Sequence, residues 1–152
     1  MNPRELLLGS FKAAVAAADP LEIVPQHLPQ PPKGRTLVVG AGKAAASMAL
    51  AVEQHWPATA PLSGLVITRY AHGYADDAAA SRIRVIEAGH PVPDESGEAA
   101  ACDIAAAVSA LGPADLLLAL VSGGGSSLLS LPVEGISMAD LKATTRELLA
   151  CG

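Results

Sequence analysis

Short apolar runs alternate with stretches of helical periodicity over most of the chain. The runs at 36–39, 64–68 and 115–121 are almost continuously apolar, which is typical of strands buried on both faces of a sheet. The run at 83–87 alternates more, so we expect that strand near an edge. Each of these runs predicts one β-strand.

Outside these runs, apolar side chains recur every three or four positions, as on one face of an amphipathic helix. Leu7 and Phe11 belong to such a stripe near the N-terminus, and Ser137 with Asp140 forms a capping box before the last one. Helices are predicted from Pro3 to Ala18, Leu21 to Leu28, Ala45 to Trp56, from a cap at Asp94 or Ser96 to Leu111, and from Ser137 to the end of the chain.

Alternating strands and helices predict an α/β fold with a doubly wound, mostly parallel, Rossmann-like sheet and helices on both faces. Right-handed crossovers favour the strand order 3-2-1-4. This order puts the first strand beside the fourth, with the topological switch between them. We therefore expect the loops after these two strands, Gly40–Lys43 and Ser122–Ser127, to meet at one crevice.

Length and composition limit the domain organisation. The 152 residues are the size of one domain, so residues 1–152 are predicted to form a single α/β unit. Hydrophobic residues make up 51%, which excludes a disordered chain. Charged residues make up 16%, below the usual ~25%, and alanine supplies much of the apolar surplus. This composition suits close-packed helices, or a surface that a partner covers.

Charge and cysteine content exclude several classes of protein. The net charge is −5 and no basic stripe is visible, so we expect no nucleic-acid partner. No apolar run approaches the ~18 residues of a membrane span, so we expect no membrane insertion. The two cysteines, Cys102 and Cys151, form neither a disulfide framework nor a metal cluster, which favours the reducing cytoplasm.

The loop after the first strand reads Gly40-Ala41-Gly42-Lys43-Ala44-Ala45. It fits G-x-G-x-x-A between a strand and a helix, where glycines let the backbone approach a phosphate. Arg69 ends the second strand in place of the acidic residue of NAD sites, and an arginine suits the 2′-phosphate of NADP. A P-loop is excluded, because Ala44 replaces the magnesium-binding hydroxyl and Leu37 the first glycine. The structural alternative is a tight turn with an exposed lysine.

The loop after the fourth strand reads Ser122-Gly123-Gly124-Gly125-Ser126-Ser127. Consecutive glycines cost backbone entropy, so we expect a positive φ or a closely approaching ligand. Successive N–H groups in such a turn form an anion-binding nest, and the serines add hydroxyl donors. A nucleophile elbow requires G-x-S-x-G, which neither Ser122 nor Ser126 satisfies. A flexible loop is the structural alternative.

Two polar residues follow the third strand, at the edge where open α/β sheets bind ligands. His90 is a candidate for acid–base chemistry, and an ordinary hydrogen-bonded loop histidine is the alternative. Asp94 could orient a hydroxyl or magnesium, and a helix N-cap explains it equally. No set of metal ligands is identifiable, so a metal site stays unassigned.

Taken together, the motifs resemble a known family. The chain is similar to the N-terminal domain of the MOFRL-type glycerate 2-kinases, which are also called hydroxypyruvate reductases. The resemblance spans nearly the whole chain and rests on the order of four segments. These are Val38-Val39-Gly40-Ala41-Gly42-Lys43-Ala44-Ala45, Gly64-Leu65-Val66-Ile67-Thr68 with His72-Gly73, Glu87-Ala88-Gly89-His90-Pro91-Val92-Pro93-Asp94, and Leu120-Val121-Ser122-Gly123-Gly124-Gly125-Ser126-Ser127-Leu128.

The resemblance implies ATP-dependent phosphorylation of D-glycerate at its 2-hydroxyl, with an active site between two α/β domains. It implies that Lys43 is the active-site lysine and that the glycine-rich loops bind nucleotide phosphates through Gly40, Gly42 and Ser122–Ser127. It also implies that an arginine of the second domain completes the site, so this chain is expected to be a fragment, inactive without that C-terminal domain. Mg²⁺ is expected with ATP, and His90 and Asp94 are the candidates for the general base.

Two other functions stay open. An NADPH-dependent hydroxypyruvate reductase is favoured by G-x-G-x-x-A and Arg69, and a non-catalytic module would bind a nucleotide or anion without turnover. The lysine in the first loop and the second phosphate nest favour the kinase. If a second domain normally covers this one, we expect an exposed apolar patch or a self-association contact near the crevice. Such a contact would produce homo-oligomers.

Overall fold

The computed structural model describes residues 2–73 and 81–152. Asp76 and Asp77, an adjacent acidic pair for which the sequence shows no metal-binding partner, lie outside the described residues. The elements are α1 (Pro3–Ala17), α2 (Pro20–Ile23), η1 (Val24–His27), β1 (Thr36–Ala41), α3 (Ala45–His55), β2 (Leu62–Arg69), β3 (Ile83–Ala88), α4 (Glu95–Ser109), β4 (Leu116–Val121), α5 (Gly125–Leu128) and α6 (Met138–Cys151).

The strands form one parallel sheet in the order β3-β2-β1-β4. Val39 in the middle of β1 pairs with Leu65 on one side and with Ala119 on the other. The predicted fold class and strand order are therefore confirmed, as is the edge position of β3. The carboxyl ends of β1 and β4 lie side by side, which brings their loops together.

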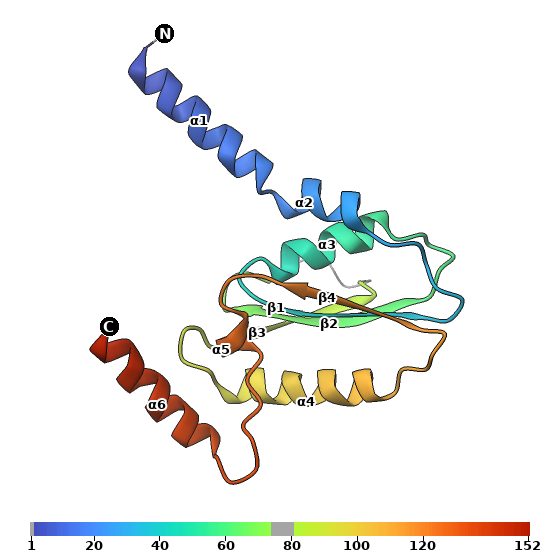
Figure 1. Cartoon of the computed structure of the whole chain (residues 1–152), viewed down its shortest axis with the longest axis vertical. Coiled ribbons are helices and arrows are strands. Elements are labelled where there is room, and N and C mark those ends of the chain that lie inside the picture. The colour runs from blue at the N-terminus through green and yellow to red at the C-terminus, as the bar shows by residue number, and fades with distance from the viewer. Residues whose placement is uncertain (1, 74–80) are drawn as a thin grey trace.

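Helices cover both faces of the sheet, α3 on one and α4 on the other (Figure 1). Val38 and Val66 point toward α3 and are fully buried in one core cluster. Ile67 and Leu128 belong to the second cluster, against α4 and α5. Each of these side chains contributes ~1.5–3 kcal/mol by leaving water. Two such layers make the sheet a rigid support for the loops at its end.

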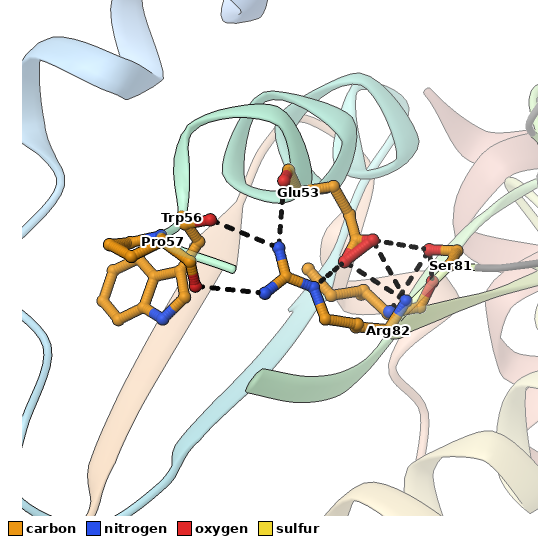
Figure 2. A network of polar contacts seen from close by, with 6 residues as sticks. Glu53, Trp56, Pro57, Ser81 and Arg82 are labelled. Atoms are coloured by element: carbon orange, nitrogen blue, oxygen red, sulfur yellow. Dashed lines mark hydrogen bonds and ion pairs between the residues drawn. The ribbon is translucent and has the colours of Figure 1, made fainter. Parts of the chain in front are cut away.

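The C-terminal end of α3 is fixed by a polar network (Figure 2). The Arg82 guanidinium donates to the Glu53 carboxylate at 3.1 Å and to the backbone oxygens of Glu53, Trp56 and Pro57 at 3.0–3.4 Å. The Glu53 carboxylate also accepts from the Ser81 hydroxyl. Arg82 therefore holds the start of β3 against the end of α3, far from the carboxyl edge of the sheet.

The helices at the two ends of the chain differ from the sequence prediction. No described residue of α1 is buried, and its stripe residues Leu7 and Phe11 are 71% and 67% exposed. In α6, Met138 is buried but Leu148 is exposed. Both helices extend away from the sheet (Figure 1). Periodicity identified these helices correctly, but it does not tell which element covers a stripe.

No helix in the described ranges is long and apolar enough to cross a membrane. Both cysteines are free and exposed.

Candidate active site

The loops after β1 and β4 are joined by three hydrogen bonds. The Lys43 N–H donates to the Gly123 carbonyl at 2.9 Å, and the Ala44 N–H donates to Ser122 Oγ at 3.1 Å. In return, the Ser122 N–H donates to the Ala41 carbonyl at 3.1 Å. The meeting of the two glycine-rich loops at the β1–β4 switch point is therefore confirmed.

Gly40 and Gly42 have a packing reason to be glycine. A Cβ on Gly40 would collide with the Leu120 carbonyl oxygen, and one on Gly42 would collide with Ser122. Gly42 also has a φ of +141°, which side chains rarely adopt. These glycines let β4 and its loop approach β1, and their contact with a phosphate stays a prediction.

The turn at Gly123–Gly125 contains the backbone donors that an anion requires. Among the described residues, no acceptor receives the N–H groups of Gly123 and Gly124. Gly124 has the predicted positive φ, +88°. The Gly125 N–H donates to the Ser122 carbonyl at 3.3 Å, so it is engaged within the protein. The available donors are therefore those of Gly123 and Gly124.

Lys43 and His90 lie against this turn. A Cβ added to Gly123 would come 3.9 Å from Lys43 Cε, and one added to Gly124 would come 2.5 Å from His90 Nε2. The Lys43 side chain is exposed and forms no ion pair with any described residue. The Lys43 side chain and the His90 ring thus lie beside two adjacent glycines whose N–H groups have no acceptor among the described residues.

The serines at the end of the loop are mostly structural. The segment expected as a loop forms the single turn α5, because the Leu129 N–H donates to the Gly125 carbonyl at 2.8 Å. Ser127 Oγ donates to the Gly124 carbonyl at 3.2 Å, while the exposed Ser126 side chain forms no hydrogen bond with another described residue. Ser126 is the serine that is best placed to contact a ligand.

Ser130 is a residue that sequence reasoning missed. Its buried hydroxyl donates to the backbone oxygens of Ser126 and Ser127 at 3.1 and 2.9 Å. It therefore closes the end of α5. No motif in the sequence signals this role, because a serine two residues beyond a short helical turn is common.

Asp94 is the N-cap of α4, as the structural alternative proposed. Its carboxylate accepts the Gly97 N–H at 3.0 Å and the Tyr70 hydroxyl at 2.8 Å. Burial raises the pKa of Asp94, but the N–H groups of Gly89 and Gly97 and the Tyr70 hydroxyl outweigh burial and lower the pKa overall. Tyr70, which follows β2, was also missed, and its pKa is raised because it donates to Asp94.

The His72-Gly73 motif lies beside the site edge and is held by Glu87. The Glu87 carboxylate accepts both backbone N–H groups, at 3.0 and 2.8 Å. The motif therefore has a local structural role at the end of β2. Nothing in these contacts brings the His72 ring to the glycine turn.

An exposed apolar groove of about 490 Å³ runs beside the glycine turn. Val121 at the end of β4 is 72% exposed and Leu129 is 42% exposed. Val39 and Ala119 form the floor of the groove on the sheet. The exposed apolar patch predicted near the crevice is therefore present.

Fold and site together define a parallel α/β protein in which a lysine, a histidine and a glycine turn with two unpartnered N–H groups, among the described residues, gather at the topological switch point. A family model described as a domain of unknown function, DUF4147, matches residues 6–152. The chain therefore belongs to the DUF4147 family.

Relatives of this chain are named as kinases and as a reductase. It is 51% identical over 152 residues to an Agrobacterium vitis protein with the provisional name hydroxypyruvate reductase, covering 100% of this chain and 34% of that protein. It is 37% identical to a Pyrococcus horikoshii glycerate 2-kinase, and the match covers 100% of this chain and 36% of that protein. The crystal structure of Thermotoga maritima glycerate kinase superposes with a TM-score of 0.77 at 34% identity, covering 97% and 35%. The chain thus spans about a third of the length of these relatives.

Proposed function

We propose that this chain supplies the phosphate-binding part of an ATP-dependent glycerate 2-kinase, which converts D-glycerate and ATP into 2-phosphoglycerate and ADP. The observation that carries the proposal is the Lys43 side chain beside two free backbone N–H groups, those of Gly123 and Gly124. The choice of glycerate as substrate rests on the names of the relatives, glycerate 2-kinase and glycerate kinase.

The proposed residues match the demands of phosphoryl transfer. Charge on the transferring group needs neutralisation and fixed donors more than covalent chemistry. Lys43 would place its positive charge on the phosphoryl oxygens, and the N–H groups of Gly123 and Gly124 would hold them. Ser126, whose side chain is exposed, would add a hydroxyl contact.

The transfer also needs a proton acceptor. The 2-hydroxyl oxygen of glycerate bonds to the γ-phosphorus, the bond from that phosphorus to the β,γ-bridging oxygen breaks, and the hydroxyl proton goes to a base. His90 is the better candidate, because its ring adjoins Gly124. Asp94 is the weaker one, because its carboxylate is already engaged by Gly97 and Tyr70.

Mg²⁺, when bound with ATP, would neutralise part of the charge on the phosphates. In the part of the chain that the structure describes, no three or more His, Cys, Asp or Glu side chains gather as a metal cluster. Mg²⁺ commonly binds through one or two carboxylates together with nucleotide phosphates and water, so the proposal does not require such a cluster.

The rest of the site would come from the part of the relatives that this chain does not span. We propose that a second domain covers the groove at Val121 and Leu129 and contributes the missing cationic residue. Without that domain, the chain would bind nucleotide but would not transfer a phosphoryl group to glycerate. Homo-oligomers and a cytoplasmic location stay predictions.

The NADPH-dependent reductase has less support, although one relative carries that name. In a dinucleotide site the pyrophosphate lies at the N-terminus of the first helix. Here the Ala44 N–H at that position donates to Ser122 Oγ, and Gly42 packs against Ser122. Protein atoms thus occupy part of the space that a pyrophosphate would need.

The test is phosphoryl transfer from ATP to D-glycerate, followed by ³¹P NMR in a polypeptide that continues into the second domain. We expect 2-phosphoglycerate with wild-type sequence and none with Lys43→Ala, while far-UV circular dichroism stays unchanged. Turnover by the Lys43→Ala protein would refute the role of Lys43. Nucleotide binding without any transfer would favour the non-catalytic module.

A further inference from the structure

Helix α3, which begins two residues after Lys43, lacks a capping side chain of its own. Its N-cap residue is Ala44, and no side chain of that segment accepts a helix N–H. Helix N-termini are usually capped by serine, threonine, asparagine or aspartate, and alanine there costs ~0.5–2 kcal/mol. The turn that places Lys43 must therefore be held from elsewhere.

Ser122 holds it from the end of β4. Its Oγ accepts the Ala44 N–H at 3.1 Å, and the next residue, Gly123, accepts the Lys43 N–H at 2.9 Å. Two consecutive N–H groups of one loop thus bind two consecutive residues of the other. Ser122 is itself fixed, because its N–H donates to the Ala41 carbonyl at 3.1 Å and Gly42 packs against it.

We propose that Ser122 is a positioning residue, whose hydroxyl sets the direction in which the Lys43 side chain leaves the backbone. This inference rests on the proposed phosphate-binding function. The Ser122 hydroxyl oxygen fixes the backbone at Ala44, and the Lys43 side chain then runs along Gly123. A small displacement of a catalytic cation costs much of its effect, because charge stabilisation depends on fixed geometry.

The experiment compares Ser122→Ala and Ser122→Thr with wild type in the 152-residue chain. The Ser109→Ala variant is the control, because it also loses one hydroxyl bonded to the backbone, here as a donor to the Ala105 carbonyl at 2.8 Å on α4. Hydrogen–deuterium exchange measures the exchange rate of the Ala44 amide proton, and titration calorimetry measures the affinity for Mg²⁺–ATP. Ser122→Cys keeps the volume with a weak acceptor and replaces Ser122→Ala if that variant does not fold.

We expect Ser122→Ala to exchange the Ala44 amide faster and to bind Mg²⁺–ATP about tenfold more weakly, because a displaced Lys43 side chain holds the phosphates less well. Ser122→Thr and Ser109→Ala should match wild type in both measurements. Unchanged exchange at Ala44, or faster exchange with unchanged affinity, would overturn the inference. A wild-type chain that binds no Mg²⁺–ATP would instead overturn the proposed function, and the exchange data would still show whether Ser122 holds the loop.

Discussion

The backbone N–H of Lys43 donates to the carbonyl oxygen of Gly123 at 2.9 Å. This bond joins a lysine at the end of β1 to a glycine turn at the end of β4. The neighbouring bond, from Ala44 to Ser122, connects residues 78 positions apart in the sequence. The site is therefore assembled by the strand order, because only adjacent β1 and β4 bring these loops into contact.

Gly124→Ala should destabilise the protein more than Gly135→Ala does. Both glycines have a φ of +88°, so both substitutions pay the ~1–2 kcal/mol cost of a left-handed alanine. The Cβ at 124 would also approach His90 Nε2 to 2.5 Å, whereas the Cβ at 135 meets nothing within 4 Å. Urea unfolding measures the difference, and equal losses would show that His90 does not pack on this turn.

Arg82→Ala should lower the free energy of unfolding by ~1–3 kcal/mol, because it removes the guanidinium that pairs with the Glu53 carboxylate and leaves the carbonyls at the end of α3 without their donor. Arg84→Ala is the control. Its ion pair with Asp103 is 64% and 59% exposed, and exposed pairs contribute at most about 1 kcal/mol. Chemical denaturation compares the two, and a smaller loss for Arg82→Ala would contradict the network's role.

Lowering the pH should reduce the free energy of unfolding more in wild type than in the Asp94→Asn variant. The pKa of Asp94 is lowered below its ordinary 3.8, so its contribution is present above that pH and is lost as pH falls through the lower folded value. Asparagine still caps a helix but does not titrate. Urea unfolding between pH 7 and pH 3 should therefore show a shallower acid limb for Asp94→Asn. Parallel curves would mean that Asp94 titrates equally in both states.

Val121→Lys should reduce dye binding and self-association, because it charges the groove that we assign to a partner domain. Val133→Lys is the matched control, since Val133 is 73% exposed, like Val121 at 72%, but does not line the groove. Fluorescence of a hydrophobic dye and sedimentation velocity give the readouts. Equal effects of the two variants would mean that the groove has no special role as a contact surface.

Much of the fold could be predicted from the sequence, because buried parallel strands produce continuous apolar runs. Strand order followed from crossover handedness, and the meeting of the two loops followed from strand order. The exposure of Leu7 and Phe11 could not be predicted, since periodicity shows a stripe but not what covers it. The roles of Ser122 and Ser130 were likewise hidden, because they depend on backbone groups of other segments.

The most direct test of the central claim is the stabilisation of the 152-residue chain by Mg²⁺–ATP compared with NADPH, in wild type and in Lys43→Ala. A ligand at ~100 times its dissociation constant adds about 2.7 kcal/mol to the free energy of unfolding. We predict stabilisation of wild type by Mg²⁺–ATP, a clearly smaller effect in Lys43→Ala, and none from NADPH. Stabilisation by NADPH alone would contradict the account.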